Sequence, residues 1–142
     1  MAGYSGTPLP RKLGIKEGSR LALVSAPEKF RSVLGELPPG VSIVPAAEGA
    51  LDVVVCFVQD SSDVEAAFLQ LKPLLAWSGG LWMAWPKHKP RAAATLNENT
   101  IRDIGLAAGL VDNKVCAIDD EWSGLRFVWR VEDRPKAVKR GG

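Results

Sequence analysis

Residues 71–130 read LKPLLAWSGGLWMAWPKHKPRAAATLNENTIRDIGLAAGLVDNKVCAIDDEWSGLRFVWR, and this stretch decides the fold. A glycine pair precedes an apolar run over residues 81–85, which is typical of a strand. A segment with helical spacing follows and ends at Gly109, a residue suited to a left-handed helix terminus. Two further runs, residues 115–119 and 125–131, are joined by turn residues and predict an antiparallel hairpin.

The same order, a strand-like run and then a helix start, occurs three times along the chain. The strand-like runs cover residues 20–24, 51–58 and 81–85. Each is followed by a Ser or Thr with a Glu three residues later, and these capping pairs are Ser25 with Glu28, Ser62 with Glu65, and Thr95 with Glu98. We therefore predict a single three-layer α/β domain with a mostly parallel sheet and a C-terminal antiparallel hairpin. The two later runs are nearly continuously apolar, which favours central strands covered by helices on both faces.

The second helix has the clearest apolar face, with Val64, Phe68 and Leu71 at helical spacing, and Pro73 should interrupt it. The placement of residues 41–44 stays open. They resemble a strand, but only residues 45–50 separate them from the next one, whereas a parallel crossover normally needs a dozen or more. Either this edge strand is very short, or the connection runs as an extended loop over the sheet.

The bulk properties fit one globular domain of ordinary composition. The chain has 142 residues, and we place the domain at residues 13–132, between an N-terminal tail (1–12) and a basic C-terminal tail (133–142). The net charge of +2 is too small to imply a polyanionic partner. No run approaches the ~20 apolar residues of a membrane helix, so we expect a cytoplasmic protein without a membrane partner. Cys56 and Cys116 lie in apolar runs and should be reduced, buried thiols.

Four segments carry a resemblance that covers nearly the whole chain: residues 3–10, residues 14–20, residues 84–87 and, above all, GLAAGLVDNKVCAIDDEWS at residues 105–123. With them the chain resembles a bacterial family of small uncharacterised proteins, a domain of unknown function. The order of strand, helix and hairpin is also similar to the C-terminal half of a class I methyltransferase. The resemblance implies a compact, Rossmann-like methyltransferase fold, and the family has no established activity to carry over.

A methyltransferase of this class holds its cofactor at a glycine-rich turn after the first strand and on an acidic residue that ends the second. Here the first turn is Ser25-Ala26-Pro27, and the second strand ends at Val44-Pro45. Both requirements fail. We therefore expect no cofactor, and we expect S-adenosylmethionine to bind poorly or not at all.

Ligands of an open α/β sheet bind beyond the carboxyl ends of its strands, and this edge provides the candidate ligand-binding residues. They are Ser25, Asp60, Trp85, Lys87, His88 and Asn97. His88 is the single histidine, and its segment can be read either as a solvated loop or as a catalytic site. No partner carboxylate is identifiable for it, so we assign no catalytic residue. Ser25 can be a plain helix cap or can help to bind an anion through free N–H groups.

The hairpin turn provides candidate interaction residues, Asp120, Glu121 and Trp122. Consecutive acidic turn residues rarely converge on one ion, so we expect no metal site. Trp122 is either folded back onto the sheet or exposed as a contact anchor. We expect a protein partner or self-association and no nucleic-acid partner, because the basic residues are few and no nucleic-acid motif is present.

Two functional hypotheses remain. The first is a non-catalytic binding or regulatory protein that uses the hairpin and the loop over residues 85–91 as contact surfaces. The second is a small-ligand binder or enzyme that uses the carboxyl edge of the sheet.

Overall fold

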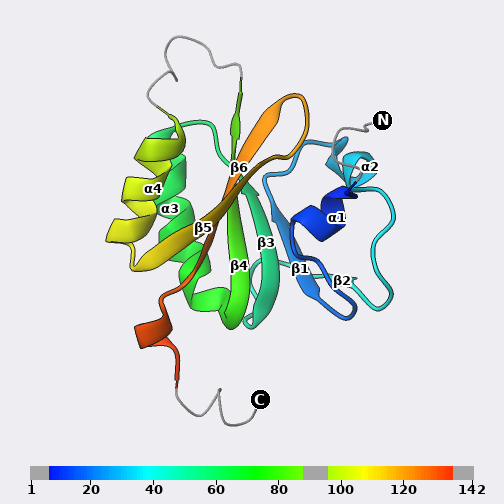
Figure 1. The fold of residues 1–142 in the computed structure, drawn as a ribbon, viewed down its shortest axis with the longest axis horizontal. Helices are drawn as coiled ribbons and strands as arrows, with labels where there is room; N and C mark the ends of the chain where they lie inside the picture. The colour runs from blue at the N-terminus through cyan, green and yellow to red at the C-terminus, as the bar shows by residue number, and fades with distance from the viewer. Residues whose placement is uncertain (1–6, 88–95, 136–142) are drawn as a thin grey trace.

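A computed structural model describes residues 7–87 and 96–135 as three layers around a six-stranded sheet (Figure 1). The strands lie in the order β2-β1-β3-β4-β6-β5. They span β1 (Arg20–Val24), β2 (Ser42–Ile43), β3 (Leu51–Phe57), β4 (Leu75–Pro86), β5 (Leu110–Ala117) and β6 (Trp122–Trp129). The helices are α1 (Leu9–Lys12), α2 (Phe30–Leu34), α3 (Ser61–Leu71) and α4 (Glu98–Ala107), with short 3₁₀ turns η1 (Lys72–Leu74) and η3 (Val131–Asp133).

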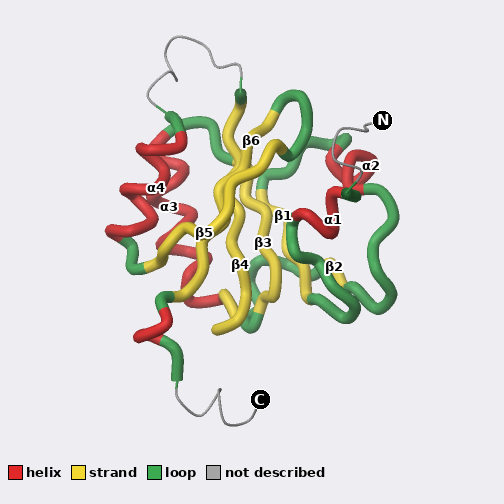
Figure 2. The backbone as a smooth tube through the Cα atoms, viewed as in Figure 1, coloured by secondary structure: helices red, strands yellow, loops and turns green. Residues whose placement is uncertain are grey.

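The predicted fold class is confirmed, because the first four strands are parallel and the last two are antiparallel. Helices lie on both faces of the sheet, as Figure 2 shows. Along β3, Val54 packs into the cluster under α3 and α4, whereas Val53 and Val55 pack into the cluster under α1 and α2. A strand that is buried on both faces needs apolar residues on both, which explains the nearly continuous apolar run of β3, interrupted only by Asp52 near its start.

The helix starts differ from the predicted capping pairs. Asp60, not Ser62, caps α3, and its side chain accepts a hydrogen bond from the N–H of Asp63 at 3.0 Å. Asn97 caps α4 by accepting from the N–H of Thr100 at 2.9 Å. Thr95 lies outside the described residues. In both helices an Asx side chain with extended backbone does the capping that the sequence assigned to a Ser or Thr nearby.

The helix predicted after the first strand, which is α2, also starts later than predicted. Lys29 occupies its N-cap position, and no side chain caps the helix. Ser25 instead lies in the turn after β1 with a φ of 56°, in the left-handed region. The predicted cap of Ser25 with Glu28 is therefore wrong, because the chain turns at Ser25 before the helix begins.

The glycine pair Gly79-Gly80 lies inside β4 and not before it. A β-carbon on Gly79 would meet the carbonyl oxygen of Leu51 at 2.6 Å, and the register with β3 shifts at this point. The pair therefore allows two backbones to approach closely within the sheet, so the strand continues through it.

Residues 41–44 form a very short edge strand, which is the first of the two alternatives. β2 pairs only with the beginning of β1, Ser42 beside Arg20, so the chain has little distance to return before β3 starts. Residues 9–12, which the sequence analysis placed in the N-terminal tail, form α1, and Leu9 packs against the buried cluster on this side of the sheet. The indole N–H of Trp82 donates to the carbonyl oxygen of Leu13 at 3.0 Å and anchors this segment.

Candidate functional site

The strand order reverses between β1 and β3, and this is where open α/β sheets bind their ligands. A cavity of about 250 Å³ lies at this point, beyond the carboxyl ends of β1 and β3 and beside α3. Its lining includes Val24, Ser25, Cys56, Gln59, Asp63 and Gln70. This volume is below the roughly 300–1,000 Å³ of most small-molecule sites.

The residues at the β1 turn and the end of β2 do not fit S-adenosylmethionine. The turn after β1 is Ser25-Ala26-Pro27, and its left-handed residue is a serine and not a glycine. β2 is two residues long and is followed by Val44-Pro45, which provide no carboxylate for a ribose. Neither close backbone approach nor a ribose ligand is therefore available where the fold would place them.

Cys56 provides a thiol in the lining of this cavity, and its surroundings keep it protonated. Burial raises the pKa of its thiol to about 12, and the charge of Asp63 adds to the effect. Asp63 is itself held in place, because its Oδ2 accepts a hydrogen bond from the N–H of Gln59 at 3.0 Å. A thiol in this state is a packing group and not a nucleophile.

The structure uses most of the predicted edge residues for folding. Asp60 and Asn97 cap helices, and the hydroxyl of Ser62 together with the N–H of Asp63 lowers the pKa of Asp60. Trp85 is buried in the core. Lys87 is exposed, and its backbone N–H donates to the carbonyl oxygen of Glu121 at 2.8 Å. His88 lies outside the described residues.

The side chain of Asp119 stabilises the hairpin turn. Oδ1 of Asp119 accepts hydrogen bonds from the N–H groups of Glu121 and Trp122, at 2.8 and 2.9 Å. Trp122 is folded back: it is 9% exposed, and its ring meets Phe57 edge-on with centroids 4.9 Å apart. Asp120 and Glu121 are exposed, and Glu121 forms a 3.2 Å ion pair with Lys29. The turn therefore presents two carboxylates without the aromatic anchor of the contact hypothesis.

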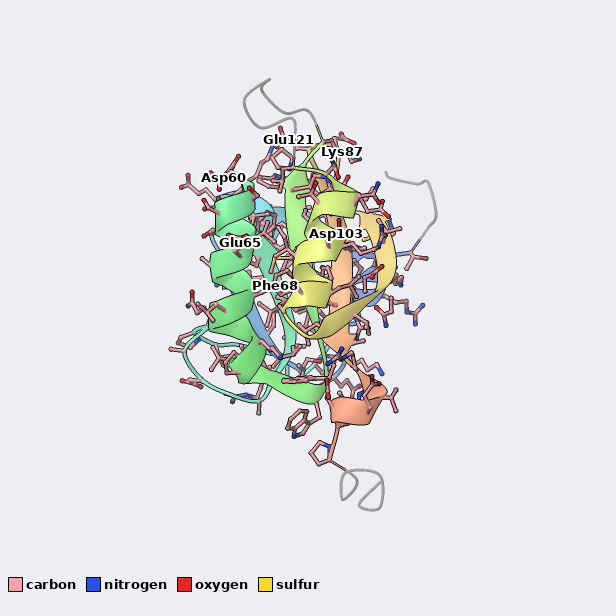
Figure 3. The ribbon with its side chains drawn as sticks, turned by 90° about the vertical axis from the view of Figure 1, so that its left-hand side faces the viewer. Asp60, Glu65, Phe68, Lys87, Asp103 and Glu121 are labelled. Carbon is pink, nitrogen blue, oxygen red and sulfur yellow. The ribbon has the colours of Figure 1, made fainter. Side chains whose placement is uncertain are left out.

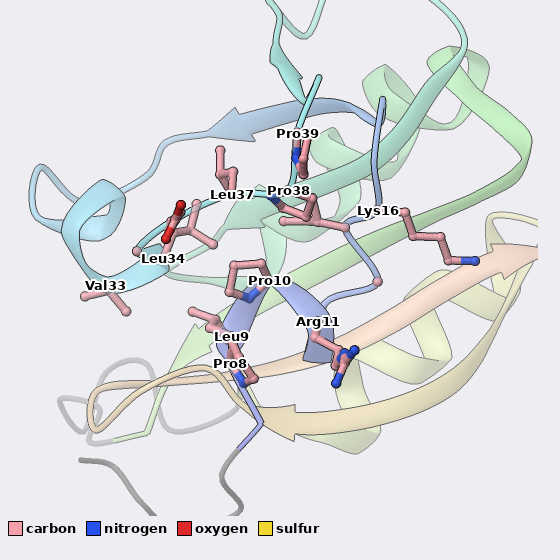
Figure 4. A pocket seen from close by; sticks show the side chains of 14 residues that line it. Pro8, Leu9, Pro10, Arg11, Lys16, Val33, Leu34, Leu37, Pro38 and Pro39 are labelled. Carbon is pink, nitrogen blue, oxygen red and sulfur yellow. The ribbon is translucent and has the colours of Figure 1, made fainter.

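The described residues form two further cavities. One, of about 630 Å³, lies between α3 and α4, with Phe68 between the two helices and Glu65 and Asp103 on either side (Figure 3). The other, of about 1,000 Å³, lies between α1 and the segment after α2 and is lined mostly by prolines and aliphatic residues, with Arg11, Lys16 and Glu36 among them (Figure 4). Among the described residues as a whole, no cluster of three metal-binding side chains occurs. No helix among them is long and apolar enough to cross a membrane.

No protein-family model matches the chain, and no curated protein is similar to it in sequence. Solved structures are similar in fold. They include a putative type 11 methyltransferase from Sulfolobus solfataricus, with 11% identity, a TM-score of 0.64, and coverage of 89% of this chain and 92% of that one. A SAM-dependent methyltransferase from Aquifex aeolicus matches with 12% identity, a TM-score of 0.59, and coverage of 82% and 85%.

A TehB-like SAM-dependent methyltransferase from Corynebacterium glutamicum covers 90% of each chain, with 11% identity and a TM-score of 0.57. The fold is methyltransferase-like. At this identity the likeness concerns the fold alone, because one scaffold serves many unrelated sites.

Ser25, which the sequence analysis placed at the carboxyl edge, lines the small cavity together with three more polar residues, of which Asp63 and Gln70 were not among the candidates. Gln59, Asp63 and Gln70 come from the end of β3 and one side of α3. Asp63 and Gln70 are seven residues apart, a helical spacing that places both on the same face. That spacing was the signal available in the sequence.

Proposed function

We propose that this protein is a non-catalytic binding protein that uses a methyltransferase-like sheet as a scaffold and docks a partner in the groove between α3 and α4. The partner presents an amphipathic helix with basic residues beside its apolar face. The observation that carries the proposal is the apolar groove itself, which lies open on the surface of the described structure.

Apolar side chains form the floor and the edges of the groove. Phe68 and Ile104 line it, and Phe68 is fully buried beneath. Leu69, at the α3 edge of the groove, is 82% exposed, and Ala107 and Ala108 line the groove from the end of α4. An apolar groove with an exposed leucine at its edge is typical of a surface that a partner covers, and a groove between two helices suits a third helix.

The charges beside the groove determine the chemistry of the partner. Glu65 and Asp103 line it from opposite helices, and neither forms an ion pair within the described structure. The one lining cation, Lys72, is already engaged, since its Nζ donates to the carbonyl oxygen of Ala108 at 2.8 Å and lies 5.1 Å from the centre of the Trp129 ring. Basic residues on the partner would therefore complement the free carboxylates.

Titration with a designed amphipathic helical peptide tests this proposal. The peptide carries leucines on one face and lysines beside them, and a matched peptide carries glutamates in place of the lysines. Calorimetry should detect binding of the lysine peptide only. Leu69→Glu should weaken it by about tenfold or more, or ~1.4 kcal/mol, because it places a charge in the apolar contact.

Val131→Glu is the matched control, because Val131 is 74% exposed in η3, away from the groove. It should leave binding unchanged. Equal binding of both peptides, or equal losses in both variants, would refute the charge-specific groove. A second copy of the chain is the competing occupant, and a dimer in sedimentation that Leu69→Glu dissociates would replace the proposed partner.

The small cavity at the switch point favours a second function, the binding of a small polar ligand. Gln59, Asp63 and Gln70 provide donors and acceptors above an apolar floor. Replacing Gln70 by Leu should then abolish the stabilisation that such a ligand gives in a thermal-shift screen of small metabolites, while the groove peptide still binds. A screen without any Gln70-dependent stabilisation would exclude this function.

A further inference from the structure

The face of the hairpin opposite α4 carries positive charges that neither the groove nor the carboxyl edge uses. Lys114 on β5 is in register with Arg126 on β6, so both side chains point to the same face. Nζ of Lys114 donates to the carbonyl oxygen of Lys12 at 3.2 Å, which brings the end of α1 to this face.

Arg126 is the centre of this group. Its guanidinium lies over Gly80 of β4, where a β-carbon would come within 2.3 Å of Nε, so glycine makes room for it. Nη1 donates to Oδ1 of Asn113 at 3.3 Å. Burial, and then the charge of Arg134, lower the pKa of Arg126. The guanidinium of Arg126 is therefore partly out of water, and the positive charge of Arg134 acts on it.

These cations do not form ion pairs with carboxylates, whereas other half-buried arginines of the protein do. Arg20, Arg102 and Arg130 each form an ion pair with an acidic side chain, and the nitrogen–oxygen distance is 2.9 Å for Arg20 with Glu48, Arg102 with Asp112 and Arg130 with Asp133. Among the described residues, no carboxylate lies within 4.0 Å of the charged nitrogens of Arg126, Arg134 or Lys114. Nε and Nη2 of Arg134 donate to the carbonyl oxygen of Trp129, at 3.2 and 2.9 Å, which fixes the position of that guanidinium.

We propose that Arg126, Arg134 and Lys114 form an oxyanion-binding site for a ligand that carries a phosphate group. A half-buried guanidinium that has other cations as its neighbours and no carboxylate is electrostatically unfavourable until an anion binds beside it. The planar guanidinium donates two parallel N–H bonds to a phosphate, and a lysine adds a third positive charge. A site with these parts favours a doubly charged oxyanion over chloride or acetate.

Thermal unfolding in increasing pyrophosphate, at an ionic strength kept constant with chloride, tests the site. The wild-type chain should be stabilised progressively, because an anion that binds only the folded state raises the melting temperature. Arg126→Gln should lower the affinity for pyrophosphate by about tenfold or more. In the absence of pyrophosphate the same variant should be at least as stable as the wild type, since it removes an uncompensated charge.

Arg130→Gln is the matched control, because Arg130 lies nearby in sequence but is paired with Asp133. It should keep nearly the whole effect of pyrophosphate. If Arg126→Gln responds to pyrophosphate like the wild type, or if both variants lose the response equally, the site does not exist. If Arg126→Gln is strongly destabilised without the anion, the residue is structural and the proposal fails.

Further titrations in the same assay distinguish which kind of compound provides the phosphate group. Inorganic phosphate, a mononucleotide and a short single-stranded oligonucleotide replace pyrophosphate in turn. A discrete site binds pyrophosphate or the mononucleotide with a weak dependence on salt. Binding of the oligonucleotide alone, with a steep loss of affinity as salt rises, would show a diffuse polyanion surface and overturn the discrete site. Leu69→Glu should leave every arm unchanged, so this result is independent of the groove.

Discussion

Cys56 illustrates how one buried side chain makes stability depend on pH. Burial raises the pKa of its thiol from 9.0 to about 12, so the folded chain keeps a proton that the unfolded chain loses. Its contribution to the free energy of unfolding is therefore complete below about pH 9 and is lost as pH rises towards 12. The buried, reduced thiol that the sequence predicted is confirmed here, while Cys116 is only partly buried.

We expect the free energy of unfolding to fall by about 1.4 kcal/mol between about pH 8 and pH 10 because of this thiol. Urea unfolding of the wild type and of Cys56→Ala at the two pH values measures the effect, and the variant should lack this share of the loss. An identical pH dependence in both proteins would show that the thiol does not titrate as its burial requires.

Trp122 gives a second prediction at the residue scale. Because its ring packs on Phe57 at 9% exposure, Trp122→Ala should cost ~3 kcal/mol or more of unfolding free energy, as core truncations do. Trp77→Ala serves as the control, since Trp77 is 38% exposed and should cost less. If Trp122→Ala and the wild type were equally stable in denaturant unfolding, the packing role would be contradicted, and the role of a contact anchor would be favoured.

The elements owe their boundaries to polar side chains at the helix starts. Asn97 is extended and accepts a hydrogen bond from Thr100, so α4 begins one residue later. Within that helix Arg102 ties the first turn to β5, by ion pairs with Glu98 and Asp112. The cap and this ion-pair network together fix where α4 starts relative to the hairpin.

Asn97→Ala should therefore destabilise the protein by about 1 kcal/mol, because the first turn of α4 loses its acceptor. Asn99→Ala is a matched change in the same turn, where the side chain accepts only an exposed hydrogen bond from Arg102 at 2.9 Å, and it should cost less. Melting temperatures of both variants give the comparison. A larger loss for Asn99→Ala would mean that the ion-pair network, and not the cap, sets the start of the helix.

At the scale of the whole molecule, a methyltransferase-like sheet is present without the features that hold the cofactor of those enzymes. We expect calorimetry to detect no binding of S-adenosylmethionine, since micromolar affinity requires about 8 kcal/mol that the turn at Ser25 and the two-residue β2 do not supply. Micromolar binding in that titration would refute the non-catalytic proposal and favour a reduced enzyme.

The sequence determined the order of strands and helices and the terminal hairpin, because apolar period and helix-start chemistry are local properties of the chain. The same reasoning placed a strand at residues 20–24 and a left-handed terminus at Gly109, and both are confirmed. Reading the caps from Ser and Thr failed where an Asx residue nearby had the extended backbone that capping requires. Local patterns identify a helix start to within a few residues but do not choose among neighbouring candidates.

Tertiary structure alone decided which residues became neighbours. Trp122 is buried in part because the ring of Phe57, which is far away in sequence at the end of β3, packs edge-on against it across β4. Gly80 is required inside β4 because Arg126 of β6 occupies the space above it. Likewise, the groove between α3 and α4 and the unpaired guanidinium groups depend on distances between elements that no local pattern contains. The candidate binding surfaces of this protein therefore depend on how the helices pack on the sheet and on which strands are neighbours, and a local sequence pattern specifies neither.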